Sequence, residues 1–332
     1  MSSTPFLAHT RLVIPFPLRC FLLVLFVGIV ALGCNEDGDD SIQSADAATR
    51  TTDDGAAASL PDSVLTPPDA ATARAFAAAM DVARAETLHT EPVGRIMQVL
   101  GEQWSGRPYL EGTLDEPPSE TLVVRLDGFD CVTFIETLHA MASAVQAKTY
   151  DYADFARHLA ALRYREGTVG YCTRLHYFTD WIATNADAGH LRRLDATLGG
   201  RPLRDTLNFM GTHRDAYDRF ATNDSLYACI RQMERSLRAA QQQRPVRYVP
   251  QDSIRATYDQ LQAGDVIAFV TSIEGLDVSH TGLVYAHEDG TKGLLHASTS
   301  GGVVVLPDLQ RYVQQIDHQI GIVVARPRVV ES

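Results

Sequence analysis

The chain has 332 residues, which is enough for one sizeable core and for two lobes around it. Hydrophobic residues make up 45% and charged residues 21%, as is typical of a soluble globular protein. The formal net charge of -12 argues against a nucleic-acid partner, because proteins that bind phosphate backbones carry an excess of lysine and arginine.

Residues 1–33 have the features of a secretion signal. Arg11 and Arg19 precede the apolar run 21–32, which is too short to span a bilayer comfortably but fits the hydrophobic region of a signal peptide. The run ends in Ala31-Leu32-Gly33-Cys34, which resembles a bacterial lipobox. The resemblance implies a lipoprotein signal peptide, with Cys34 lipidated and anchored in a membrane. An ordinary cleaved signal and a single membrane anchor are the alternatives.

Residues 34–72 are predicted to form a disordered acidic tether. They contain nine acidic residues, one arginine and no aromatic residue, so they supply -8 of the net charge. Such a segment has too little apolar surface to offset the entropy of ordering. Acidic segments behind a lipidated cysteine resemble the surface-export signals of some Gram-negative lipoproteins, and a plain spacer is the alternative. We therefore expect a lipid anchor in the bacterial cell envelope, on the periplasmic or the surface face of the outer membrane.

Residues 73–332 are predicted to form one domain whose helices precede its strands. Helices first and a meander of short strands afterwards indicate an α+β fold with an antiparallel sheet. Thr72 is the expected N-cap of the first helix. The periodicity predicts helices over 73–88, 91–103, 131–147, 152–163 and 221–241, an extended run over 121–126, and strands over 264–270, 280–287, 294–299, 303–305 and 321–325.

A cysteine stands at the start of the third predicted helix. The extended run is broken by Asp127-Gly128, and Asp130 is a good N-cap for the helix that begins at Cys131. A thiol there lies at the positive end of the helix dipole, so we expect the nucleophilic thiolate to be favoured. The alternative role for Cys131 is that of a small buried apolar residue.

Two histidines are suited to activate this thiol. His280 opens one strand and His296 lies in the next, and a nucleophilic thiol needs an imidazole that is itself oriented by a partner. A two-residue turn at Asp289-Gly290 would place the imidazoles on opposite faces of the hairpin. A three-residue loop 288–290, with Gly290 in the left-handed conformation, would place them on one face. We predict the longer loop and a Cys131–His280–His296 triad, with the backbone N–H of Cys131 as an oxyanion donor.

Four segments resemble the NlpC/P60 cysteine peptidase superfamily of bacterial peptidoglycan hydrolases. They are Gly-Arg-Pro-Tyr at 106–109, Phe-Asp-Cys at 129–131, the pair 264–267 and 280–285, and Leu-His-Ala-Ser at 295–298. The resemblance implies a papain-like fold with the nucleophile at a helix start packed on an antiparallel sheet, and no cofactor. It also implies that Tyr109 reaches the site and assists the oxyanion, whereas a packed loop aromatic is its alternative role.

The chain departs from common NlpC/P60 endopeptidases in two places. Val132 follows Cys131 where those enzymes have Ser-Gly, and a helical insert of roughly 110 residues (150–260) separates the cysteine from the histidines. Both features resemble the DUF1460 branch, described as N-acetylmuramoyl-L-alanine amidase-like, over residues 75–327. The resemblance implies hydrolysis of the N-acetylmuramoyl–L-alanine amide in peptidoglycan or muropeptides through a cysteine acyl-enzyme. A γ-D-glutamyl endopeptidase and a catalytically silent wall-binding lipoprotein are the alternatives.

The insert contains a segment rich in groups that recognise ligands. Guanidinium groups bind carboxylates with two parallel hydrogen bonds, and the peptidoglycan stem peptide carries carboxylates. Of Arg163, Arg165 and Arg174, we expect about one to touch substrate. Arg174 is favoured because it lies beside His176. A solvated surface position and an ion pair with Glu166 or Asp180 are the alternative roles. The candidate substrate-binding residues are Arg163, Arg165, Tyr171, Arg174 and His176.

No metal site is predicted, because the chain has neither an HExxH nor a CxxC motif. Two further cysteines, Cys172 and Cys229, either pair in a disulfide or remain buried thiols, and their spacing does not decide between the two.

Overall fold

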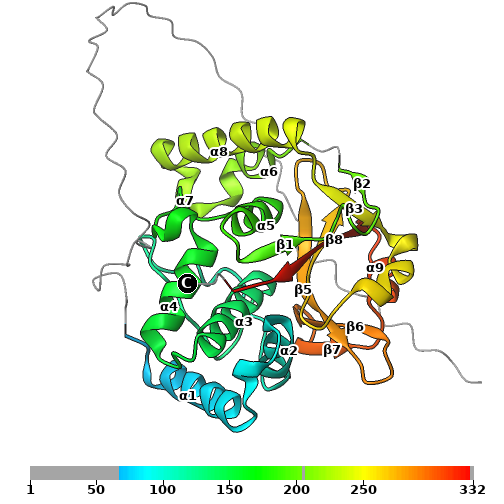
Figure 1. Cartoon of the computed structure of the whole chain (residues 1–332). Helices are drawn as coiled ribbons and strands as arrows, with labels where there is room; N and C mark the ends of the chain where they lie inside the picture. The colour runs from blue at the N-terminus through cyan, green and yellow to red at the C-terminus, as the bar shows by residue number, and fades with distance from the viewer. Residues whose placement is uncertain (1–66, 204–205, 330–332) are drawn as a thin grey trace, which may run out of the picture. The chain divides into compact units, whose positions relative to one another are not determined.

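The computed structural model describes residues 67–203 and 206–329 (Figure 1). The predicted signal peptide, Cys34 and residues 34–66 of the predicted tether lie outside the described residues. Within the described ranges, no helix is both long enough and apolar enough to cross a bilayer.

The fold is α+β with an antiparallel sheet, as predicted. The helices are α1 Ala70–Ala85, α2 Val93–Glu102, α3 Cys131–Gln146, α4 Tyr152–Arg163, α5 Phe178–Asp187, α6 Phe209–Thr212, α7 Asp218–Ala221, α8 Asp224–Gln243 and α9 Leu309–Gln314. The strands are β1 Leu191–Arg193, β2 Arg201–Pro202, β3 Arg247–Pro250, β4 Val266–Thr271, β5 Val278–Ala286, β6 Lys292–Ser298, β7 Gly302–Leu306 and β8 Gln319–Pro327. Strands β4 to β8 follow the helices α1 to α8, although β1 and β2 lie between helices and α9 precedes β8. Helices α5, α6, α7 and α9 and the short strands β1 to β3 were not predicted.

The start of α1 differs from the prediction. Asp69, and not Thr72, caps the helix, because its carboxylate accepts the Thr72 backbone N–H at 2.7 Å. Thr72 is buried inside the first turn. The predicted boundary of the tether at residue 72 therefore falls within α1.

The extended run 121–126 is not a strand, which corrects a second prediction. Its carbonyl groups are taken by side chains rather than by a neighbouring strand. Arg163 Nη1 donates to the Val123 carbonyl at 2.7 Å, and the Tyr164 hydroxyl donates to the Thr121 carbonyl at 3.1 Å. After this run, Phe129 forms an isolated parallel β-bridge with Tyr109. The bridge holds the loop that carries Tyr109 against the start of α3.

The sheet has the strand order β2-β3-β8-β4-β5-β6-β7, and β1 also pairs with β8. Strand β4 lies between β8 and β5 and is buried along its whole length, as expected for a continuous apolar run. Alternate residues of β4 enter two separate cores: Val266, Ala268 and Val270 pack with α2 and α3, whereas Ile267 and Phe269 pack with α9. Figure 1 shows α3 and α9 on different sides of the sheet.

The β5–β6 hairpin has the predicted three-residue loop. The His287 N–H donates to the Thr291 carbonyl at 3.1 Å, which closes the loop 288–290, and Gly290 has φ +86°. The pairs Leu283–Leu295 and Ala286–Lys292 continue the same register along the strands. This register was inferred because only an odd loop length places His280 and His296 on one face, and it is confirmed.

The insert between α4 and β4 has a small core of its own, formed by residues such as Tyr177, Phe220 and Ile230. It is joined to the sheet by Asp277, a buried residue just before β5. The Asp277 carboxylate accepts the Thr179 backbone N–H at 2.8 Å and the Thr179 hydroxyl at 2.6 Å, and so satisfies donors at the start of α5. These hydrogen bonds attach the insert to Asp277, which lies three residues before His280 in the chain.

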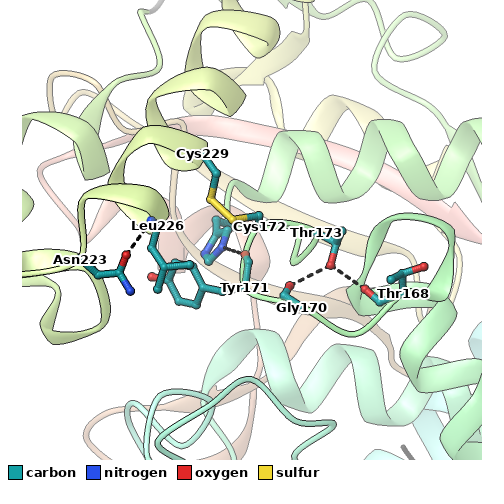
Figure 2. The surroundings of a disulfide bond; sticks show 9 residues. Thr168, Gly170, Tyr171, Cys172, Thr173, Asn223, Leu226 and Cys229 are labelled. Carbon is teal, nitrogen blue, oxygen red and sulfur yellow. Dashed lines mark hydrogen bonds between the residues drawn. A yellow bond between two sulfur atoms is a disulfide. The ribbon is translucent and has the colours of Figure 1, made fainter. Parts of the chain in front are cut away.

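A disulfide between Cys172 and Cys229 joins the loop before α5 to α8, with a Cα–Cα distance of 5.9 Å (Figure 2). This decides the question that the sequence left open. Within the described residues, Cys131 is the free cysteine.

We predict that replacing both bonded cysteines by serine lowers the free energy of unfolding by about 2–4 kcal/mol, because the bond restricts a long loop of the unfolded chain. The measurement is urea unfolding of the double variant Cys172→Ser/Cys229→Ser beside the unmodified protein. Unchanged stability would contradict this account of the bond.

Candidate active site

The turn before α3 is anchored by packing and by a capping box. The Phe129 ring is buried and stacks on Trp104 with centroids 4.9 Å apart. Asp130 accepts the backbone N–H groups of Val132 at 2.9 Å and Thr133 at 2.7 Å, while the Thr133 hydroxyl accepts the Asp130 N–H at 3.0 Å. The predicted N-cap is confirmed, and the position of Cys131 at the first turn is fixed from both sides.

The Cys131 sulfur lies against β5. It is hydrogen-bonded by the backbone N–H of Thr281, the residue directly after His280, and by the Tyr109 hydroxyl. Segments far apart in the sequence therefore meet at the sulfur: the loop that carries Tyr109, the start of α3 and the start of β5.

The environment of the sulfur favours the thiol, not the thiolate that the helix dipole alone predicted. Burial and the neighbouring Asp130 carboxylate raise the pKa of Cys131 to about 12, although its hydrogen bonds act in the opposite direction. The expectation of a stabilised thiolate is wrong for the resting protein. The same carboxylate that caps the helix places a negative charge beside the sulfur.

His280 and His296 form a hydrogen-bonded pair, with His280 Nε2 2.6 Å from His296 Nδ1. Burial lowers the pKa of His280 to about 3 and that of His296 to about 4, and the neighbouring His296 ring adds to the shift of His280. Both imidazoles are therefore neutral at pH 7. If His280 donates from Nε2, its Nδ1 is left as an acceptor, as a general base requires.

Two aromatic residues that the sequence did not reveal pack around this pair. Phe269 of β4 stacks on His280 with centroids 5.6 Å apart, and Tyr312 of α9 meets His296 edge to face at 5.1 Å. Phe269 is paired with His280 in the β4–β5 ladder, so an alignment of the two strands could have revealed it. Tyr312 lies on a helix that was not predicted, and no local signal marks it.

A pocket of about 190 Å³ opens beside the start of α3. Three of the five predicted substrate-binding residues line it: Arg163, Arg174 and His176. The Tyr171 ring lies under the Arg174 guanidinium at 4.8 Å. Arg165 lies elsewhere, in a separate hollow beside the disulfide, and pairs with Asp180. The pocket is lined by Gly112, Leu114, Asp115, Asp130, Val132, Glu136, Arg163, Arg174, Leu175 and His176.

His176 is held as a neutral ring in this pocket. Burial and the nearby Arg174 cation lower its pKa to about 3, and Nε2 lies 2.7 Å from the Tyr171 carbonyl. Since a carbonyl only accepts, Nε2 carries the proton and Nδ1 is left as an acceptor for a donor group of a ligand.

In the part of the chain that the structure describes, no group of three or more histidine, cysteine, aspartate or glutamate residues could hold a metal ion. The chemistry available from the described residues is that of a thiol, two imidazoles and a phenol that remains neutral, because burial raises the pKa of Tyr109 far above its ordinary value.

Comparisons with known proteins show the family to which the chain belongs. A family model described as N-acetylmuramoyl-L-alanine amidase-like matches residues 99–322. A crystal structure of an N-acetylmuramoyl-L-alanine amidase from Bacteroides uniformis is 31% identical with a TM-score of 0.66, over 71% of this chain and 99% of that chain. A Bacteroides fragilis protein described as a candidate xylanase is 34% identical with a TM-score of 0.63, over 68% of this chain and 98% of that chain.

A more distant structure, protein LPG0564 from Legionella pneumophila, matches the DUF1460 family model. It is 20% identical with a TM-score of 0.57, over 78% of this chain and 97% of that chain, and so it shows a shared fold. No curated protein matched the chain.

The chain therefore belongs to the N-acetylmuramoyl-L-alanine amidase-like family. The matched residues begin in α2 and end in β8, so they include Cys131, both histidines and the whole insert. The resemblance to this family is confirmed, while the wider placement in the NlpC/P60 superfamily stays a prediction.

Stability is predicted to fall on acidification. The pKa values of His280 and His296 are lowered in the folded chain, so below about pH 6.5 the unfolded chain binds protons that the folded chain does not. Each histidine then reduces the free energy of unfolding by up to about 1.4 kcal/mol per pH unit, until the pH reaches its folded pKa. Urea unfolding at pH 7, 6 and 5 measures the slope. His296→Gln should give a shallower slope, and parallel curves would contradict the assignment.

Gly282 is predicted to be required for the histidine pair. A Cβ atom there would lie 2.5 Å from Leu294 Cδ1 and 3.1 Å from His296 Cβ, so Gly282→Ala must move the Leu294 side chain and press on His296. We expect a loss of about 1–3 kcal/mol in stability and a lower kcat. Gly290→Ala, in the loop of the same hairpin, is the control: its positive φ makes it destabilising, but it has open space and should leave kcat unchanged. Equal effects on kcat would show that only stability matters.

Proposed function

We propose that the protein hydrolyses the amide between the muramic acid lactyl group and L-alanine in peptidoglycan fragments, with Cys131 as the nucleophile. One observation carries the cysteine mechanism: the partly exposed Cys131 sulfur at the start of α3 is hydrogen-bonded by the Thr281 N–H, next to His280, which is itself paired with His296 at 2.6 Å. Family membership and the named amidase from Bacteroides uniformis support the choice of bond.

The first step transfers a proton within the site. The thiol proton moves to His280 Nδ1 as the sulfur attacks the lactyl carbonyl carbon. Because the thiol pKa is raised and the imidazole pKa is lowered, an isolated ion pair of the two is disfavoured, and proton transfer accompanies attack instead of preceding it. His296 orients His280 by accepting the Nε2–H.

The negative charge on the carbonyl oxygen is stabilised by neutral donors. The Tyr109 hydroxyl reaches the sulfur and remains protonated, so it can donate to an oxygen that develops beside it. The backbone N–H of Cys131, at the open end of α3, is the second donor. Both roles follow the assignment made from the sequence.

The reaction then divides into acyl transfer and hydrolysis. The C–N bond breaks as His280 gives its proton to the nitrogen, and the stem peptide leaves with a free L-alanine amine. A water molecule next attacks the thioester, giving one proton to His280, and the lactyl group leaves as a carboxylic acid. His280 returns that proton to the sulfur, which restores the resting thiol.

Product analysis tests the bond that is cut. A muropeptide digested by the full chain should yield disaccharide and an intact stem peptide, as measured by mass spectrometry. Cleavage within the stem would instead show a γ-D-glutamyl endopeptidase, and absence of any product would show a wall-binding protein without activity.

Cys131→Ala is predicted to lower kcat by about 10³-fold or more, since removal of a nucleophile leaves only binding and oxyanion stabilisation. The change deletes one atom at the start of a well-capped helix, so stability should be little affected, and circular dichroism checks the fold. Wild-type turnover by a folded variant would exclude the thiol mechanism.

The coupled proton transfer makes a separate prediction for thiol chemistry. Alkylation of Cys131 by iodoacetamide should be slow at pH 7 and become faster only as the pH approaches the raised thiol pKa of about 12. A fast reaction at pH 6 that is lost in His280→Ala would show a preformed thiolate–imidazolium pair instead. Mass spectrometry of the labelled peptide follows the reaction.

We also propose that Cys34 is lipidated and that residues 34–66 tether the domain to a membrane of the cell envelope. The support for this is the lipobox-like sequence at 31–34 and the apolar run before it. Membrane fractionation of cells that express the unmodified chain and Cys34→Ala tests the proposal. Equal recovery of both proteins in the membrane fraction would exclude this anchor.

A further inference from the structure

The three arginines predicted to bind substrate differ in whether the carboxylates paired with them can be displaced. Arg163 Nε donates to Glu136 at 2.7 Å, and both side chains are 2% exposed, so this ion pair is sealed. The carboxylate that pairs with Arg165 is 5% exposed and lies away from the pocket beside Cys131. Arg174 pairs with two carboxylates: Asp115 at 2.6 Å, which is 46% exposed, and Glu120 at 3.5 Å, which is 6% exposed.

Arg174 faces the pocket with one donor engaged by this exposed carboxylate. Its Nη2 donates to Asp115 Oδ1 at 2.6 Å, while Nη1 lies 3.4 Å from the Leu114 carbonyl and 3.5 Å from Glu120. The guanidinium itself is 7% exposed and lies over the Tyr171 ring. The cation is therefore fixed and largely desolvated, and of its two carboxylate partners Asp115 is the one in contact with water.

The loop that carries Arg174 is held in place independently of Asp115. The Thr173 hydroxyl donates to the Gly170 carbonyl at 2.8 Å and is also bonded to Thr168, and the neighbouring Cys172 is joined to α8 through the disulfide (Figure 2). Asp115 instead lies in a segment of turns and bends, residues 111–119, without helix or strand. Displacing Asp115 would therefore leave the arginine in position.

We propose that Arg174 binds a carboxylate of the substrate's stem peptide, and that this carboxylate takes the place of Asp115. The proposal rests on the proposed function, because it assigns the stem peptide to the pocket beside Cys131. The exchange conserves charge: one carboxylate leaves the guanidinium for water and another arrives. Asp115 thus acts as an internal competitor that occupies the Nη2 donor of Arg174 until substrate binds, while Glu120 stays beside Nη1.

Within the pocket, Arg174 is the position at which a ligand carboxylate fits, because the other charged lining groups already have partners. Glu136 is neutralised by Arg163, and Asp130 is used by the helix cap, so neither charge is free to attract a cation. A cavity of about 190 Å³ is smaller than the roughly 300–1,000 Å³ of sites that enclose a whole small molecule. It suits one part of the substrate, such as a single acidic residue.

This assignment predicts discrimination between an acid and its amide. A stem peptide whose D-glutamate has a free α-carboxylate can displace Asp115, whereas the corresponding D-isoglutamine peptide cannot form the charged pair. Arg174 would then set specificity for unamidated stems, which is a property separate from the chemistry at Cys131.

The test is equilibrium binding to the full chain carrying Cys131→Ala, so that turnover does not interfere. Two synthetic muropeptides, identical except for D-glutamate or D-isoglutamine, are titrated by calorimetry. We expect the acid to bind about 10-fold or more tightly than the amide, since a hydrogen-bonded charge pair is lost with the amide. Adding Asp115→Asn should tighten binding of the acid about three- to five-fold and leave the amide unchanged. Adding Arg174→Gln should abolish the preference.

Glu116→Gln is the matched control. Glu116 is the next residue of the same segment but faces Arg125, at 3.6 Å, so its substitution should change neither affinity. Equal binding of the acid and the amide would overturn the proposal, and so would an unchanged preference in Asp115→Asn. If Arg174→Gln does not fold, the Asp115→Asn variant alone tests the proposal. Failure of the proposed function is seen separately, as absence of disaccharide release by the unmodified chain.

Discussion

The contact between the start of α3 and the start of β5 is the interaction on which the rest of this structure depends. A thiol is a weak nucleophile in a buried site, and it becomes useful only when a base lies next to it. The Thr281 N–H holds the Cys131 sulfur directly beside the residue that supplies the imidazole. The two cores on either side of the sheet fix the helix and the strand relative to each other.

This contact has an electrostatic cost. Burying the thiol and capping its helix with Asp130 both raise the thiol pKa, and burying the imidazoles lowers theirs. The resting site is therefore neutral, which suits a buried position, because isolated charges in a medium of low dielectric are strongly disfavoured. Charge separation is confined to the moment of attack, when oxyanion donors are available to compensate it.

The insert contributes recognition instead of chemistry. Its ion pairs range from the sealed Arg163–Glu136 pair to the half-exposed Arg174–Asp115 pair, and this difference in burial separates structural arginines from one that can exchange its partner. The disulfide at Cys172 joins the recognition loop to α8, so the loop is ordered before a ligand arrives. Preorganisation of this kind reduces the entropy lost on binding.

The sequence by itself determined the elements that local rules control. Helical periodicity placed α3, the capping preference identified Asp130, and the period of two along β5 and β6 required a three-residue loop with Gly290 at positive φ. The order of the sequence motifs also led to the family. Each motif, around Cys131 or around one of the two histidines, is a short run of neighbouring residues, so it can be read without the fold.

Only the tertiary structure decided what depends on neighbours from distant segments. The thiol pKa followed burial and not the helix dipole, the run 121–126 gave its carbonyls to α4 side chains, and Tyr312 reached the histidines from an unpredicted helix. The partners of the arginines were likewise invisible, because Asp115 lies 59 residues from Arg174 along the chain. Desolvation and ion pairing are properties of packed space, and a one-dimensional pattern does not contain them.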